Sequence, residues 1–166
     1  MKGESFKTWA FKHAMNVYPM FLGTGGKVLF LKSDWTHATV RLKLGIFTRN
    51  YVGTIFGGSQ FAAADPFFMV LLINCIGKEF VVWDKAGAIQ FKRPSKDVIK
   101  ADFVYTPEEL KTIRETTIKN GSYEFTKTIS WINPEGKVVS VVDKTIYVAT
   151  KEFYRQRQKA KQETTH

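Results

Sequence analysis

Cysteine is almost absent from this sequence, in which Cys75 stands alone among 166 residues. A chain with one cysteine forms no internal disulfide, and zinc sites built from several cysteines are excluded as well. Histidine is also rare: His13, His37 and His166 do not follow the spacing of metal ligands, so we expect no metal site. Twelve glycines and five prolines argue against a low-complexity chain, and 14 Phe, 4 Trp and 6 Tyr argue against a disordered one.

Long hydrophobic runs are lacking too. The longest apolar stretch, Pro66 to Ile73, is much shorter than the ~20 residues that a membrane-spanning helix needs. Residues 1–21 contain neither a continuous apolar segment nor a cleavage site made of small residues, which are the marks of a secretory signal. Together with the single free cysteine, these absences predict a cytoplasmic protein without a membrane span.

Acidic residues are outnumbered: 25 Lys and Arg face 15 Asp and Glu, which gives a net charge of +10. This balance favours anionic partners, such as nucleic acid, an anionic membrane or a small molecule that carries phosphate. Charge alone does not choose among them, and a basic surface also occurs in proteins that are merely soluble. Because no nucleic-acid recognition motif is present, we expect no nucleic acid as a partner.

Apolar periodicity predicts an α+β fold in one domain over residues 1–166, with a core at 25–150 and a basic tail at 151–166. A helix is expected over residues 5–19. Its apolar stripe consists of Phe6, Trp9, Ala10, Val17, Met20 and Phe21, with His13 among them.

The remaining pattern predicts one antiparallel sheet of five to six strands wrapped around a central buried helix. The helix covers residues 61–76, which are apolar on nearly every side. Strands are expected at 28–32, 38–44, 79–92, 98–105, 122–132 and 137–150. Thr106 and Glu109 have the spacing of a capping box, which predicts a further helix that ends at Gly121.

Two features next to the central helix suggest chemistry. Gly57 and Gly58 precede the helix, where backbone N–H groups without a neighbouring Cβ suit a carbonyl oxygen that gains negative charge. Asp65 is a carboxylate inside the apolar run, where we expect it to be buried and suited to act as a base or a nucleophile. The opposing interpretation is structural, because Asp65-Pro66 is also a common pair for starting a helix.

The spacing of these residues limits the mechanism. At a rise of 1.5 Å per residue, Asp65 lies roughly 10 Å along the helix from Gly58. One reacting carbonyl does not reach both in the same chain, so cooperation between them would require a site shared between two copies at a dimer interface.

The stretch around Asp65 resembles the N-x-x-G-T-x-H-G-G-x-x-F-x-x-A-D motif of hotdog-fold acyl-CoA thioesterases. The matching residues are Asn50, Gly53, Thr54, Gly57, Gly58, Phe61, Ala64, Asp65 and Phe68. The branch that it resembles most is the phenylacetate-degradation type, and within it an uncharacterised thioesterase-like family with a "VVWDKA" stretch, found here at residues 81–86. The resemblance covers roughly residues 25–150.

The resemblance implies a hotdog homodimer, or a tetramer built from two such dimers, that hydrolyses an acyl thioester with no cofactor other than the coenzyme A of its substrate. Asp65 would activate water or attack the thioester. The Gly57 N–H, with Gly58 nearby, would polarise the carbonyl, helped by the partner's Asn50 side chain, and Asp84 falls where such enzymes orient water. Substrate contacts are expected from Phe56, Phe61, Phe68, Lys85, Lys92 and Arg93, the cations for the phosphates of coenzyme A.

The sequence departs from the motif at one position: Phe56 stands where the pattern has His. A phenyl ring packs against an acyl chain but neither forms hydrogen bonds nor moves protons. Two hypotheses therefore follow, an acyl-CoA thioesterase and a non-catalytic module that binds acyl-CoA or fatty acid.

Overall fold

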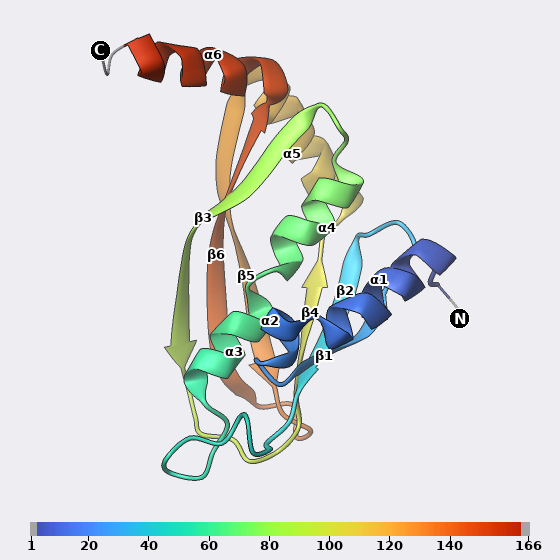
Figure 1. Cartoon of the computed structure of the whole chain (residues 1–166), viewed down its shortest axis with the longest axis vertical. Coiled ribbons are helices and arrows are strands. Elements are labelled where there is room, and N and C mark those ends of the chain that lie inside the picture. The colour runs from blue at the N-terminus through green and yellow to red at the C-terminus, as the bar shows by residue number, and fades with distance from the viewer. Residues whose placement is uncertain (1–2, 164–166) are drawn as a thin grey trace.

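The structure is a computed structural model that describes residues 3–163. The outermost residues of the predicted domain, and the end of the basic tail with His166, lie outside the described residues. The helices are α1 (Phe6–Val17), α2 (Pro19–Leu22), α3 (Gly57–Ala64), α4 (Phe67–Cys75), α5 (Pro107–Asn120) and α6 (Lys151–Glu163). The strands are β1 (Gly26–Leu31), β2 (His37–Leu42), β3 (Phe80–Phe91), β4 (Ile99–Val104), β5 (Ser122–Ile132) and β6 (Val138–Thr150) (Figure 1).

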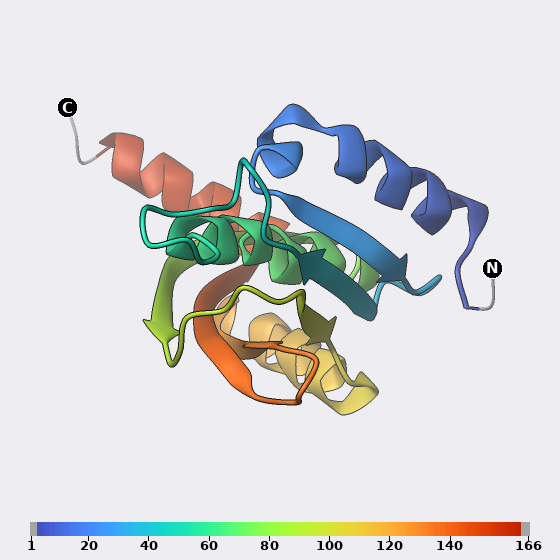
Figure 2. The same ribbon diagram turned by 90° about the horizontal axis from the view of Figure 1, so that it is seen from below.

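The strands form one antiparallel sheet in the order β1-β2-β4-β5-β6-β3. Seen from below, the sheet curves around α3 and α4, with β1 and β3 at its two ends (Figure 2). All six predicted strands are present, and β2 shows the expected alternation of buried and less buried residues. The predicted sheet wrapped around a central helical segment is confirmed.

The central segment is two helices rather than the single helix predicted over residues 61–76. α3 ends at Ala64 and α4 begins at Phe67. The physical reason is Pro66, which has no N–H for the hydrogen bond to the preceding turn. Four residues of α4 are completely buried and form the middle of the core: Phe67, Phe68, Leu71 and Leu72.

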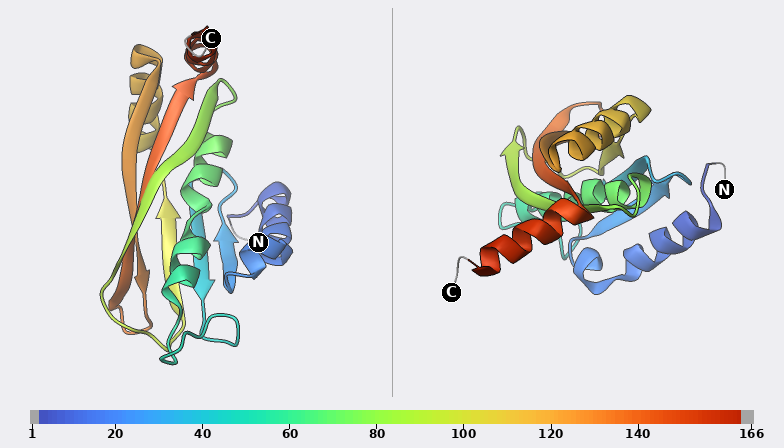
Figure 3. Two further views of the ribbon diagram at one scale, coloured as in Figure 1. Left: turned by 60° about the vertical axis from the view of Figure 1, so that its left-hand side comes forward. Right: turned by 90° about the horizontal axis from the view of Figure 1, so that it is seen from above.

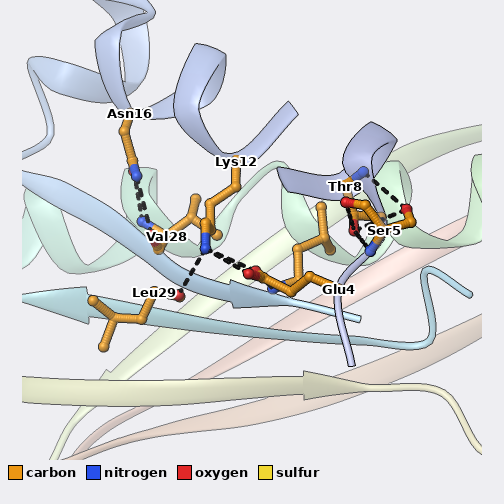
Figure 4. Close-up of polar contacts among 8 residues, drawn as sticks. Glu4, Ser5, Thr8, Lys12, Asn16, Val28 and Leu29 are labelled. Atoms are coloured by element: carbon orange, nitrogen blue, oxygen red, sulfur yellow. Dashed lines mark hydrogen bonds and ion pairs between the residues drawn. The ribbon is translucent and has the colours of Figure 1, made fainter. Parts of the chain in front are cut away.

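The N-terminal helices cover the β1 end of the sheet through polar contacts. Asn16 acts like a neighbouring strand: its Nδ2 donates to Val28 O at 3.0 Å and its Oδ1 accepts from Val28 N at 2.7 Å (Figure 4). Glu4 accepts from Leu31 N at 3.1 Å and forms an ion pair with Lys12 at 2.8 Å. These side chains occupy backbone groups that an edge strand otherwise leaves open to another chain.

The predicted apolar stripe of the N-terminal helix divides in the structure: Phe6 and Val17 are exposed, whereas Phe21, in α2, is buried. α1 turns Thr8 and Lys12 toward the sheet, while Phe6 and Val17 are exposed. The predicted stripe would bury Phe6 and Val17. Instead, Phe11 and Met15 of α1 pack against the core, beside polar residues of α1 that find hydrogen-bond partners along β1.

At the other end of the molecule, the structure agrees closely with the predictions made from the sequence. Thr106 and Glu109 form the predicted capping box at the start of α5. β5 and β6 are joined by a turn in which Gly136 N donates to Asn133 O at 3.0 Å. The basic tail begins with α6, which runs away from the end of the sheet (Figures 1 and 3).

Candidate functional site

Asp65 lies at the break between α3 and α4. Its backbone N–H donates to Phe61 O at 3.0 Å, so the residue closes α3, and no side chain caps α4. The interpretation of Asp65-Pro66 as a helix-starting pair is therefore wrong. The expectation of a buried carboxylate is also wrong, because 51% of the Asp65 side chain is exposed. The helix break leaves this carboxylate at the surface of the helical layer.

A buried lysine holds Asp65 in place. Lys144 Nζ donates to Asp65 Oδ1 at 2.5 Å and to Asp84 Oδ2 at 2.9 Å, and only 4% of the lysine side chain is exposed. Lys144 comes from the middle of β6, and its ammonium group also lies 5.7 Å from the centre of the Phe61 ring. The three charged groups carry one net negative charge when all are ionised.

Asp84 is the more buried carboxylate of the pair, with 18% of its side chain exposed. Burial raises the pKa of Asp84, the hydrogen bond from Lys144 lowers it in part, and the nearby Asp65 charge raises it further, so the net shift is upward. Burial works to lower the pKa of Lys144, but the hydrogen bonds to both carboxylates outweigh it and the net shift is upward. Asp84 Oδ1 is buried without a hydrogen-bond partner. The arrangement favours a charged lysine and a carboxyl group that accepts a proton readily.

Gly57 and Gly58 begin α3 beside a separate cavity of about 750 Å³. The N-cap residue is Phe56, whose side chain has no hydrogen-bond acceptor, so no side chain caps the first N–H groups of α3. A Cβ on Gly57 would lie 2.5 Å from the Phe91 ring, and one on Gly58 would lie within van der Waals overlap of the Phe56 ring. The lining of this cavity includes Asn50, Phe56, Gly57, Phe91, Lys92 and Arg93.

The structure distributes the predicted site residues over several places. Asn50 lines the Gly57 cavity, but its amide bonds within its own loop: Nδ2 donates to Thr54 Oγ1, and Oδ1 accepts from Thr54 N, both at 2.9 Å. Lys92 and Arg93 line the same cavity. Lys85 instead forms an ion pair with Glu124 at 2.6 Å.

Phe68 and Phe61, two of the predicted substrate contacts, lie in different surroundings. Phe68 is 1% exposed and packs edge-on against Phe103 and Tyr105, so it belongs to the core and lines neither cavity near the site. Phe61 lies beside Asp65, in a second cavity of about 370 Å³ between the N-terminal helices and α3. Within one chain, Asp65 and Gly57 therefore open into different cavities.

Sequence reasoning missed Lys144. The sequence does contain a signal, because Lys144 occupies the same every-second-residue pattern along β6 as Val142, Ile146 and Val148. All four residues are buried. A lysine in register with core residues needs a buried counter-charge. Identifying that counter-charge as Asp65, 79 residues earlier, required the folded structure.

Three other features of the described residues bear on metal binding, thiol reactivity and membrane crossing. No group of three or more His, Cys, Asp or Glu side chains in residues 3–163 has the geometry of a metal site. Burial raises the pKa of the Cys75 thiol to about 11, which disfavours the reactive thiolate. None of the helices in that range is long and apolar enough to cross a membrane.

Comparison with known proteins places the chain in a family. Residues 7–148 match the family described as "Domain of unknown function (DUF4442)", and the chain belongs to it. No match was found among curated proteins.

Solved structures show the same architecture. A Pseudomonas aeruginosa protein of unknown function, called a probable thioesterase, superposes with a TM-score of 0.78 at 16% identity, over 89% of this chain and 99% of that one. A Haemophilus influenzae thioesterase gives a TM-score of 0.64 at 12% identity, over 89% and 94%. A hypothetical thioesterase from Streptococcus pneumoniae, solved with coenzyme A, gives 0.54 at 16% identity, over 88% and 98%. The predicted hotdog fold is confirmed.

Proposed function

We propose that this protein hydrolyses acyl-CoA thioesters at a site shared between two copies of the chain. The observation that carries the proposal is the half-exposed carboxylate of Asp65, held by the buried Lys144 at the break in the central helical segment. The fold shared with proteins called thioesterases, one of them solved with coenzyme A, supports the choice of substrate. The motif around Asp65 also supports a relationship to the phenylacetate-degradation branch of these thioesterases.

In the proposed reaction, Asp65 takes a proton from water while the water oxygen attacks the carbonyl carbon of the thioester. The Gly57 N–H, with Gly58 beside it, stabilises the negative charge that develops on the carbonyl oxygen. The carbon–sulfur bond then breaks, the thiolate of coenzyme A takes up the proton, and a free acid leaves. Direct attack by Asp65, with later hydrolysis of the resulting anhydride, gives the same products. Asp84, bound to the same lysine, would orient the water.

The two ends of the sheet support a homodimer. Asn16 and Glu4 occupy backbone groups of β1, whereas β3 ends the sheet on the other side with the exposed residues Ala86, Gly87 and Ala88. Small side chains on an open strand edge allow a second strand to pair. Joining two copies at β3 would place the helical layers side by side, so that Asp65 of one serves Gly57 of the other.

Lys92 and Arg93 line the cavity beside Gly57, where their charges suit the phosphates of coenzyme A. This surface would therefore receive the carrier end of the substrate. Pairing of dimers into a tetramer and a cytoplasmic location remain predictions.

The test is release of free thiol from acyl-CoAs that range from acetyl to dodecanoyl and include phenylacetyl. Asp65→Asn keeps the shape of the side chain and removes its basicity, so turnover should vanish while substrate binding persists. Equal turnover in the variant and the wild type would refute the role of Asp65.

Mixing two inactive variants tests the shared site. Asp65→Asn and Gly57→Val should together recover about a quarter of wild-type turnover, because half of the dimers are hybrids and each hybrid has one intact site of two. No recovery, with subunit exchange verified by native mass spectrometry, would contradict sharing.

One observation favours the alternative, a binding module without turnover. The rings of Phe56 and Phe91 lie directly against the two glycines, where a reacting carbonyl would have to enter. A folded wild type that hydrolyses none of the substrates but retains an acyl ligand through purification, detected by native mass spectrometry, would support this alternative.

A further inference from the structure

The cavity beside Asp65 is bounded on one side by the N-terminal helices α1 and α2, which are firmly attached to the rest of the molecule. α1 is fixed to β1 by Asn16, Glu4 and Lys12, as Figure 4 shows. α2 is anchored by Phe21, which is 2% exposed and meets Phe67 of α4 edge-on, with ring centres 5.5 Å apart. The cavity between these helices and α3 is therefore bounded by ordered structure on both sides.

The cavity combines a large apolar surface with a single charged group. Its lining is mostly apolar and contains one acidic residue, Asp65. The apolar and aromatic residues around it include Met15, Tyr18, Met20, Phe61 and Pro66. Thr24 also lines the cavity, but its hydroxyl is used, since Oγ1 donates to Phe21 O at 2.6 Å. Lys144 binds Asp65 Oδ1, and half of the Asp65 side chain is exposed.

We propose that the cavity between α2 and α3 binds the apolar acyl group of the thioester, with the carbonyl carbon at Asp65. The inference rests on the proposed function and adds to it a location for the acyl group. A thioester has the matching asymmetry, because an apolar chain ends in one reactive polar group. The volume of about 370 Å³ lies at the small end of the range for small-molecule pockets, which suits an acyl group without its carrier.

This assignment divides the substrate between two chains. The acyl group lies in the cavity beside Asp65 of one copy, and the coenzyme A portion lies in the partner copy's cavity beside Gly57. Met15 and Met20 have flexible, unbranched side chains that adapt to ligands of different shape. The site should therefore accept a range of chain lengths up to the limit that the cavity sets.

The experiment fills the cavity and measures chain-length preference. Met20→Trp adds bulk at the cavity wall, and Ala62→Met fills it from α3 on the opposite side. Leu22→Trp is the matched control, because Leu22 is exposed on the same short helix but does not line the cavity. Affinity is measured by calorimetry for non-hydrolysable thioether analogues of acetyl-, butyryl-, octanoyl- and dodecanoyl-CoA.

Both filling variants should bind the octanoyl analogue about tenfold more weakly than wild type, the loss expected when two methylene groups remain in water. The acetyl analogue and the Leu22→Trp control should show no change. An unchanged chain-length profile in both filling variants, each with wild-type circular dichroism, would overturn the proposal.

The outcome is separable from that of the proposed function. Thiol release that depends on Asp65, together with an unchanged binding profile, would refute the acyl cavity and leave the hydrolase standing. A changed profile in a protein without turnover would support the acyl cavity in a binding module. No binding of any analogue to the wild type would refute the cavity assignment.

Discussion

Replacing Lys144 with methionine tests how much free energy the buried charge cluster contributes. The lysine Nζ lies 2.9 Å from Asp84 Oδ2 and 2.5 Å from Asp65 Oδ1. Without the ammonium group, Asp84 becomes a mostly buried carboxylate with no counter-charge, which costs about 3 kcal/mol. The contact with Asp65 contributes at most about 1 kcal/mol, because half of that side chain is exposed. Methionine fills a similar volume, so little is added for a cavity.

We therefore expect Lys144→Met to lower the free energy of unfolding at pH 7 by about 3 to 4 kcal/mol. Urea unfolding followed by tryptophan fluorescence measures this change. Lys85→Met is the matched control: that lysine forms a short ion pair with Glu124, but both side chains are nearly half exposed. The control should lose no more than about 1 kcal/mol.

Two further measurements sharpen the test. The double variant Lys144→Met/Asp84→Asn should regain most of the lost stability, because no buried charge then remains without a partner. The deficit of Lys144→Met should also shrink at pH 4, where Asp84 takes up a proton. Losses of equal size for Lys144→Met and Lys85→Met at pH 7 would refute this reasoning.

Two more variants test the electrostatics of the cluster and the cover over the sheet edge. Because the pKa of Asp84 is raised on folding, the folded protein loses stability as the pH rises above the ordinary value of 3.8. The stability of Asp84→Asn relative to wild type, measured by urea unfolding, should therefore increase from pH 4 to pH 7. A constant difference would contradict the assigned pKa direction. Asn16→Ala removes both hydrogen bonds to Val28 and should cost about 1 to 2 kcal/mol. Light scattering should also show more self-association as the β1 edge opens, and unchanged stability would show that the contact contributes nothing.

Much of the fold was accessible from local patterns. β5 was predicted at residues 122–132 and occupies them, and the capping box at Thr106 and Glu109 is present. Such features depend on residues that are neighbours along the chain, so the sequence contains most of the information that they need. Pro66 carried the signal for the break in the central helix, but the continuous apolar run around it masked that signal.

The arrangement around the candidate site depended on tertiary structure. The motif predicted Asp65 and Gly57 as site residues, and their spacing along α3 separates them within one chain, as their two cavities show. The sequence did not reveal that Asp65 is half exposed while Asp84 is largely buried, or that Lys144 joins the two. These properties depend on which surfaces distant segments cover.

The N-terminal helix shows the same division. The sequence by itself determined that residues near the N-terminus form a helix with an apolar stripe. Only the tertiary structure decided that Phe6 and Val17 face outward while Asn16 binds the edge of β1. A periodic pattern determines which residues share a face of a helix, whereas the hydrogen bonds and burial available on folding determine where that face points.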